Sequence, residues 1–398
     1  LLVDESHYGK RLSPTLADDG SRRAEDLATK VEWLLKTHGP IATVMFATGT
    51  PVSNTLAEMW TTQRYLAKAV LAQAGVDRYE AWAKTFGCSV NRVEVSPDGA
   101  SFKVASRFSA FQNVPELLAL YWQCADLATT ADLERAGIVK LPTAHRFTVQ
   151  VEAGSVQRRA VADLSRRASL IDAGTPELRD KVNGGKCRDS MLLVTGDGRK
   201  AALDPELLGL PPCTRGGKIK ACARQVHALW RATKDRVHPN GVTGSLQLVF
   251  CDFGTPGARG ARVYGKLRRC LVEMGMPTSA VRFVHNAKTA AAKRNLFADC
   301  RSGRVAVLIG STEKCGLGTN VQDIMVGLHH LDAPWRPSDV TQRTGRCLRS
   351  GNLWAHVGVF TYVTAGTFDA FMWQTLERKA TFTAQLFSPD FVGRRVEE

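Results

Sequence analysis

Short apolar runs alternate with longer amphipathic segments in the C-terminal part of the chain. Beyond Gly244 the apolar runs occupy residues 246–251, 281–285, 305–309, 325–331 and 357–363. Runs of this length predict buried β-strands, and the segments between them are long enough to form helices. Because a helix usually crosses back over the sheet between parallel strands, this alternation predicts a parallel sheet covered by helices on both faces. We therefore expect an α/β lobe here.

Two of the other segments show a clear helical period. Residues 287–300 place apolar side chains on one face and basic side chains, such as Lys293, on the other. Residues 367–386 begin at Thr367, a candidate N-cap, and continue with an apolar stripe of Phe368, Phe371, Met372 and Leu376. Such stripes are typical of helix packing, so we expect them to be buried.

The N-terminal part of the chain repeats the alternation with fewer elements. Apolar runs at residues 1–4 and 41–47 predict strands, and residues 25–35 predict a helix. The buried face of that helix is formed by Leu27, Val31, Leu34 and Leu35. Two strands and one helix are only part of an α/β lobe, so the lobe at residues 1–86 is expected to be incomplete.

Residues 87–240 have a less regular pattern and separate the two lobes. Helices are predicted after Pro115 and over residues 156–170, the latter rich in arginine. From residue 151 to 240 there are 17 Lys or Arg against 10 Asp or Glu. This surplus favours either a surface that tracks DNA or a solvated, mainly helical insertion. The second lobe would then occupy residues 241–398.

Composition narrows the class of partner. The chain has 398 residues, enough for two or three domains, and 53 basic against 38 acidic residues give a net charge of +15. Such an excess favours a polyanionic partner, although an arginine-rich composition alone would also produce it. The chain has no apolar run of about 18 residues and does not open with a basic-then-apolar signal segment, so we expect a cytoplasmic protein.

Cysteine and histidine patterns do not favour a metal centre. None of the ten cysteines is spaced Cys-x-x-Cys, so we expect reduced, mostly buried thiols. His329, His330 and Asp332 form a cluster in the sequence. Because neighbouring residues on a strand point to opposite faces, the two histidines are poorly placed to bind one ion. We interpret them as strand residues.

Polar residues that could carry chemistry follow both N-terminal strands. Asp4 and Glu5 come directly after the first apolar run, and His7 lies two residues further on. An acidic pair at this place can hold Mg²⁺ and orient a water, but an ordinary strand end would look the same. The second run ends in a turn formed by Thr48, Gly49, Thr50 and Pro51, with Asn54 beyond it.

Glycines and arginines cluster between residues 311 and 352. Gly316, Gly318 and Asn320 lie in a glycine-rich turn after an apolar run. Soon after Ser338 the chain carries Gln342, Arg343, Arg346 and Arg349. Guanidinium groups stay charged and offer forked donors to phosphate oxygens, so this arrangement is typical of phosphate sensing. A surface ion pair is the alternative interpretation of the last two arginines.

Taken together, these segments resemble motifs II, III, V and VI of superfamily-2 helicases, closest to the Swi/Snf-like branch. The motifs are DESH, ATGTPVSN, residues 309–320, LDAPWRPSD and QRTGRCLR. More narrowly, FCDFGTP, HHLDAPWRPSDVTQRTGRCLRSGN and TFDAFMWQTLERKATF resemble the helicase part of phage and mobile-element proteins of the anti-restriction type, which join a helicase to an adenine-specific DNA methylase. The matches cover most of residues 1–64 and 246–385.

The resemblance implies two RecA-like lobes that bind ATP and Mg²⁺ between them and move along DNA, with RNA left open. It implies that Asp4 holds Mg²⁺, that Glu5 activates water, and that Arg346 and Arg349 meet the triphosphate when the lobes close. Nucleotide binding and coupling would fall to His7, Gly316, Gly318, Asn320, Gln342 and Arg343. DNA binding and coupling would fall to Thr48, Gly49, Thr50, Thr319, Trp335 and Arg336. Arg199 and Lys200, in a stretch that recurs in the family, are expected to contact nucleic acid.

One motif of the family does not appear where the resemblance places it. The phosphate-binding loop (Walker A), Gly-x-x-x-x-Gly-Lys-Ser/Thr, would precede the Asp4–Glu5 strand. The glycine and lysine spacing recurs only from Gly260 to Lys266, where Leu267 replaces the hydroxyl residue. This stretch falls in a segment with a helical apolar period, so we interpret the match as coincidence.

The sequence thus favours a DNA-dependent ATPase, a helicase or double-strand DNA translocase belonging to a larger phage or mobile-element protein for DNA modification or anti-restriction. Two alternatives stay open. One is a catalytically incomplete helicase-like fragment that binds nucleic acid or acts as a scaffold. The other is a translocating subunit of a restriction system.

Overall fold

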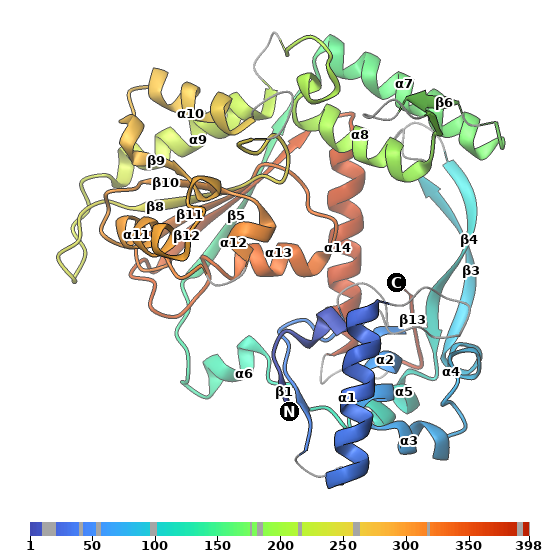
Figure 1. The fold of residues 1–398 in the computed structure, drawn as a ribbon. Helices are drawn as coiled ribbons and strands as arrows, with labels where there is room; N and C mark the ends of the chain where they lie inside the picture. The colour runs from blue at the N-terminus through green and yellow to red at the C-terminus, as the bar shows by residue number, and fades with distance from the viewer. Residues whose placement is uncertain are drawn as a thin grey trace.

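The computed structural model describes residues 1–9, 21–39, 43–52, 57–95, 102–175, 177–180, 186–213, 217–257, 263–316, 319–387 and 393–397. Within them, a large α/β lobe from the second half of the chain (yellow to red in Figure 1) lies next to a smaller N-terminal lobe (blue). The α/β class expected from the sequence is confirmed.

The large lobe is built on a six-stranded sheet in which every described pairing is parallel. Its strands, in spatial order, are β5 (Thr143–Val151), β12 (His356–Thr364), β11 (Met325–His330), β8 (Leu246–Phe250), β10 (Val307–Gly310) and β9 (Val281–Phe283). Five of these strands overlap the five apolar runs of the sequence. Every residue of the central strands β8, β10 and β11 is buried, as their continuous apolar runs predict.

Helices cover both faces of this sheet. α9 (Gly217–Thr233) and α10 (Val263–Glu273) pack on one face against Val249 and Ile309. α11 (Ala290–Arg301) and α12 (Thr312–Gly316) pack on the other face against Leu248 and Phe250. The neighbouring residues Leu248 and Val249 thus point to opposite faces, as a strand requires. Beside α12 lies α13 (Pro337–Thr344).

The edge strand β5 extends this lobe beyond the range of residues 241–398 expected for it. β5 pairs with β12 along its whole length, from Thr143 opposite His356 to Val151 opposite Thr364. Most of its side chains are exposed, and Phe147 is 49% exposed. A half-exposed edge strand lacks the continuous apolar run of a buried one, which is why the pattern did not reveal it.

The small lobe contains two short parallel strands, β1 (Leu2–Val3) and β2 (Met45–Phe46). Its helices are α1 (Arg22–His38), α2 (Ala57–Leu66), α3 (Lys68–Gln73), α4 (Tyr79–Phe86) and α5 (Val114–Tyr121). Trp60, Trp82 and Phe111 lie at the centre of its larger apolar core. In the described residues these two strands form a two-stranded sheet, and the expectation of an incomplete lobe stays a prediction.

The segment between the lobes is helical in part. An antiparallel hairpin of β3 (Gly87–Val95) and β4 (Phe102–Gln112), which also pairs with β13 (Arg395–Glu397), opens it. The short helix α6 (Thr130–Arg135) leads to β5, and two longer helices follow, the arginine-rich α7 (Ser155–Asp172) and α8 (Met191–Leu203). Between α7 and α8 lies a short hairpin of β6 (Leu178–Asp180) and β7 (Lys186–Arg188). α7 matches the predicted basic helix, whereas the long strands β3 and β4 were not expected.

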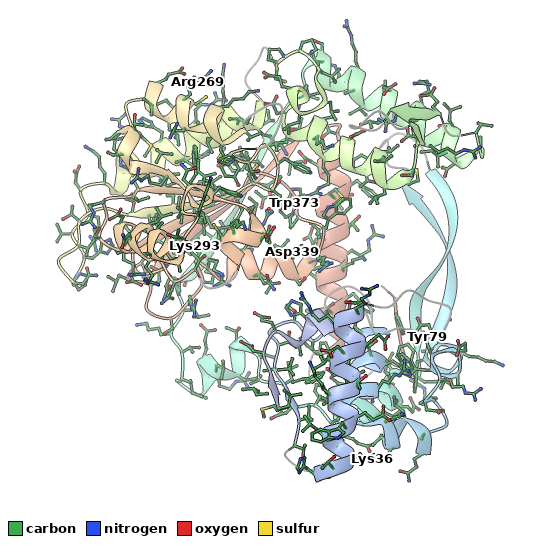
Figure 2. All side chains as sticks on the ribbon, in the orientation of Figure 1. Lys36, Tyr79, Arg269, Lys293, Asp339 and Trp373 are labelled. Carbon is green, nitrogen blue, oxygen red and sulfur yellow. The ribbon has the colours of Figure 1, made fainter. Side chains whose placement is uncertain are left out.

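A single helix reaches from one lobe to the other. α14 (Phe368–Leu386) packs Phe368, Met372 and Leu376 beside Ala333 of the large lobe. Near its other end, Phe382 is 4% exposed in the core of the small lobe. Figure 1 shows α14 (red) running between the two, and Figure 2 labels Trp373 on this helix and Asp339 on α13, which lies beside it. The predicted apolar stripe therefore packs against the large lobe, and Phe382, which was not part of that stripe, packs in the small lobe.

None of the helices in the described ranges combines the length and hydrophobicity needed to cross a membrane.

Candidate nucleotide and nucleic-acid site

The small lobe presents two carboxylates where β1 ends. Glu5 has a φ of 51°, a left-handed conformation that residues other than glycine seldom adopt. Its N–H donates a hydrogen bond of 2.9 Å to Asp4 Oδ1, which orients the exposed Asp4 carboxylate. A strained backbone that a local hydrogen bond supports is common at functional sites. The exposed oxygens of Asp4 also fit Mg²⁺, which protein sites usually bind through one or two carboxylates and retained waters.

His7 connects this strand end to the end of β2. The buried His7 ring places Nδ1 3.2 Å from Glu5 Oε2 and 3.1 Å from Thr48 Oγ1. Thr48 Oγ1 in turn accepts a hydrogen bond of 3.1 Å from the N–H of Thr50. Gly49 lies in the exposed turn between the two threonines. Residues about forty positions apart therefore form one hydrogen-bonded chain, here called the Glu5–His7–Thr48 chain.

In the large lobe the expected role of Arg343 is wrong. Its guanidinium is fully buried, with Nη2 2.7 Å from Asp252 Oδ2 and 3.1 Å from Asp332 Oδ1. Nε donates to Thr312 Oγ1 (2.8 Å) and Nη1 donates to the carbonyl oxygen of Asp332 (2.9 Å). A buried cation needs such partners, and these leave it no path to a nucleotide. Arg343 is a structural residue.

Asp252 and Asp332 connect several motif segments through hydrogen bonds near the ends of the strands. Asp332 Oδ2 accepts a hydrogen bond of 2.6 Å from the N–H of Asp252, and Asp252 Oδ1 accepts one of 2.7 Å from the N–H of Thr312. Burial, together with the charge of Asp252, raises the pKa of Asp332 to about 6, against the opposing effect of Arg343 and Arg199. Sequence reasoning assigned no catalytic or binding role to Asp252, Asp332 or Thr312, although all three lie in the motif segments.

Arg346 and Arg349 follow α13, at the side of the large lobe that approaches Glu5. Arg346 is half-buried, and its Nη1 donates to the carbonyl oxygen of Thr319 at 3.4 Å. Burial lowers the pKa of Arg346, and Arg349 lowers it further, whereas the negative charge of Glu5 opposes this change. Glu5 and Arg346, from different lobes, therefore lie within electrostatic range of each other. Arg349 is exposed.

The remaining residues of the glycine-rich turn lie close to these arginines. Gly316 ends α12, Thr319 is buried, and the exposed Asn320 accepts a hydrogen bond of 2.8 Å at its carbonyl oxygen from Arg301. Gly318 lies outside the described residues, as does Asn54. On α13, Gln342 is half-buried.

Trp335 and Arg336 are exposed just before α13. Arg336 donates its N–H to Asp339 Oδ2 (3.2 Å), a hydrogen bond that caps the helix. The indole of Trp335 is 48% exposed and lies over the guanidinium of Arg199, 4.5 Å from its carbon to the ring centroid.

The expectation that Arg199 and Lys200 contact nucleic acid directly is wrong for Arg199. Arg199 is 5% exposed and donates to the carbonyl oxygen of Ala333 at 2.6 Å. Lys200 is half-buried and pairs with Asp197 at 3.3 Å. Arg199 thus belongs to the interior of the large lobe, where α8 supplies it from a distant part of the sequence.

Lys266, the lysine of the Gly260–Lys266 spacing, lies within α10. It forms ion pairs with Asp204 and, at 2.8 Å, with Glu206. Both carboxylates already pair with this lysine, and Gly260 lies outside the described residues, so the coincidental nature of this spacing stays a prediction.

The histidines of β11 have separate surroundings. His329 lies between Gln247 Oε1 (3.0 Å) and the hydroxyl of Tyr362 (2.9 Å). His330 instead stacks near Phe250 and meets the ring of Trp373 edge-to-face. In the described ranges no group of three His, Cys, Asp or Glu side chains is arranged to hold a metal ion. All nine cysteines whose side chains are described are free, and Cys222, Cys251, Cys300, Cys315 and Cys347 are buried.

Two family models match the chain. Residues 1–129 match a model described as a probable helicase domain, and residues 248–351 match the helicase conserved C-terminal domain. The chain belongs to the helicases. The assignment made from the motifs is confirmed, and the matches include the segments that carry Asp4, Glu5, Asp332 and Arg346.

Two individual proteins illustrate how this helicase compares with others. Over 93 residues it is 36% identical to "Defense against restriction protein B" of Escherichia phage P1, a stretch that covers 23% of this chain and 4% of that protein. Among solved structures, "Crystal structure of the C-terminal part of Fun30 ATPase domain" aligns with 59% of this chain and 89% of that one, at 17% identity and a TM-score of 0.39.

Proposed function

We propose that the chain is the motor part of a DNA-dependent ATPase, a Swi/Snf-like helicase or double-strand DNA translocase. The observation that carries this proposal is the Glu5–His7–Thr48 chain of the small lobe, which lies within electrostatic range of Arg346 of the large lobe. This arrangement combines a carboxylate, a link to a neighbouring strand end and a cation from a second lobe. Phosphoryl transfer from a nucleoside triphosphate needs these groups on opposite sides of the nucleotide.

Each group has a role that its position supports. Asp4 would hold the Mg²⁺ that accompanies ATP and that neutralises phosphate charge. Glu5, whose Oε2 is held by His7, would orient the attacking water and take up its proton. Arg346 and Arg349 would stabilise the negative charge that develops on the phosphate oxygens as the lobes approach.

Nucleic acid is the partner that the charge favours. The net charge of +15 suits a polyanion, and binding through phosphates would be weakly sequence-specific and strongly salt-dependent. Thr48, Gly49 and Thr50 would report the nucleotide state from the small lobe, since His7 links Thr48 to Glu5. Thr319, Trp335 and Arg336 would act from the large lobe.

We also propose a larger context. The phage P1 relative is named for defence against restriction, and only 4% of it aligns with this chain. A motor within a long anti-restriction protein of a phage or mobile element, with a methylase elsewhere in that protein and acting in the bacterial cytoplasm, is consistent with this match.

A second candidate is a helicase-like module that binds nucleic acid without hydrolysing ATP by itself. It is favoured by Lys266, since the one lysine with phosphate-loop spacing is already paired with Asp204 and Glu206. In this case ATP turnover would need a phosphate-binding loop supplied by another segment.

The test is ATP hydrolysis by the full-length gene product with single-stranded DNA, duplex DNA or RNA as stimulator. Glu5→Gln is expected to lower the stimulated rate by about 100-fold or more while DNA binding persists. Glu32→Gln, at an exposed carboxylate of α1, is the matched control. An unchanged rate of stimulated ATP hydrolysis in Glu5→Gln rejects the catalytic assignment. If the wild type binds DNA but DNA does not raise its rate of ATP hydrolysis, the second candidate is favoured.

A further inference from the structure

α8 contributes to the motif cluster of the large lobe from outside both matched family domains. The matched ranges end at residue 129 and resume at residue 248, whereas α8 spans Met191–Leu203. The helix is held close to the lobe by α14, because Gly198 lies directly against the ring of Phe368. A Cβ at this position would lie 2.7 Å from that ring, so the helices could not approach as closely with another residue here.

This approach places the guanidinium of Arg199 over two aromatic rings. Its guanidinium carbon lies 4.8 Å from the centroid of Phe253 and 4.5 Å from that of Trp335. Nη2 fixes the plane by donating to the carbonyl oxygen of Ala333, two residues before Trp335. Burial lowers the pKa of Arg199, and the charges of Asp332 and Asp252 oppose this change.

An arginine suits this position for a physical reason. Its flat guanidinium can stack on ring faces while the in-plane N–H groups still donate, whereas the ammonium of lysine can do only part of this. The contacts also connect Arg199 to the one exposed aromatic side chain of the loop between β11 and α13, Trp335, which is 48% exposed.

We propose that Arg199 is a positioning residue, which holds the Trp335 ring so that its exposed surface can stack on a nucleobase. This inference rests on the proposed function for its ligand, since stacking on aromatic rings is how sequence-tolerant proteins hold unpaired bases. Arg199 itself touches no nucleic acid. It acts through the orientation of Trp335 and of the neighbouring Arg336.

The first experiment measures the position of Trp335 without any ligand. Iodide quenches the fluorescence of exposed tryptophans. The Trp335 contribution is isolated by subtracting the fluorescence of the matching Trp335→Phe variant from that of each protein. We expect Arg199→Lys to raise the quenching constant by about twofold or more, because the ring is no longer held against a planar cation. Arg231→Lys, at an exposed arginine of α9, is the control. An unchanged quenching constant in a folded Arg199→Lys protein overturns the proposal.

The second experiment measures binding of single-stranded DNA by fluorescence anisotropy in a double-mutant cycle. Arg199→Lys should weaken binding by about fivefold in the wild-type background and by less than twofold in Trp335→Ala. Equal losses in both backgrounds would show that Arg199 acts without Trp335, against the proposal. Phe253→Leu removes the other ring and leaves the cation, so it should also weaken binding of single-stranded DNA. This variant replaces Arg199→Lys in the test if Arg199→Lys does not fold.

The two experiments separate this inference from the proposed function. If the wild type binds no nucleic acid, the proposed function fails, and the quenching result alone decides whether Arg199 positions Trp335. A second outcome is that the wild type binds DNA and prefers duplex, while the double-mutant cycle shows no coupling between Arg199 and Trp335. In that case the helicase assignment stands and the stacking role is rejected.

Discussion

At the scale of single residues, His7 in the small lobe and Asp332 in the large lobe connect segments that follow different strands. His7 contacts a carboxylate and a hydroxyl from two strand ends, so it can pass a change at one to the other. Asp332 is a buried acid beside a second acid and two arginines, so its protonation state affects the stability of the large lobe. Each residue leads to a separate measurement.

Replacing His7 should uncouple hydrolysis from nucleic acid. In His7→Ala, Glu5 loses its contact at Oε2 and Thr48 loses its link to Glu5, so stimulated ATP hydrolysis by the full-length protein should fall roughly 10- to 100-fold. His38→Ala, at the exposed end of α1, is the control. A stimulated rate within twofold of the wild type would show that the Glu5–His7–Thr48 chain does not couple the two sites.

Asp332 should make stability depend on pH in the acidic range. Its pKa rises from 3.8 to about 6 on folding, so the folded state holds a proton that the unfolded state releases. This contribution is complete below pH 3.8 and is lost as the pH rises through 6, by on the order of 3 kcal/mol. Urea unfolding should show this decline for the wild type relative to Asp332→Asn, and no such decline relative to Asp26→Asn, an exposed acid of α1.

At the scale of elements, α13 and the turn after it carry two arginines with different surroundings. Arg343 points into the lobe and connects β8, β11 and α12 through Asp252, Asp332 and Thr312. Arg346, one helical turn later, lies near Thr319 and within range of Glu5. A structural arginine on α13 is therefore followed, in the turn after the helix, by a candidate catalytic one.

The two arginines should respond to substitution in opposite ways. Arg343→Ala leaves the buried Asp332 and the half-buried Asp252 without their main cation and should lower the free energy of unfolding by about 3–5 kcal/mol. Arg346→Ala should keep the fold and ATP binding but lower hydrolysis by about a thousandfold. Chemical denaturation and single-turnover hydrolysis of both variants check this. If Arg343→Ala is as stable as the wild type, the structural role of Arg343 is contradicted and the residue becomes a candidate for nucleotide binding again.

At the scale of the whole molecule, α14 is the element that both lobes share. Its N-terminal half packs beside α8 and α13, and Phe382 near its other end enters the core of the small lobe. Phe382 lies 6.3 Å, centroid to centroid, from Phe111 in that core. A movement of one lobe relative to the other must therefore bend, shift or release this helix.

Removing the anchor of α14 in the small lobe should separate the unfolding of the two lobes. Phe382→Ala removes a buried ring, so the small lobe should lose about 3–5 kcal/mol of stability. Differential scanning calorimetry should then show an earlier transition for the small lobe. Thr381→Ala, an exposed neighbour on the same helix, should leave the profile unchanged. A uniform shift of one transition would mean that the lobes stay coupled without Phe382.

The sequence by itself determined the buried strands of the large lobe, the helices around them and the assignment to the helicases. Strands covered on both faces carry continuous apolar runs, and chemistry at strand ends needs particular residues at fixed spacing, so both signals are local. Only the tertiary structure decided that β5 joins the sheet, that Arg343 is buried, and that Arg199 lies under Trp335. All three outcomes depend on which distant segments pack together, and for the two arginines this packing also removes a charge from water. Desolvation is a property of the assembled neighbours and leaves no periodic pattern in the chain.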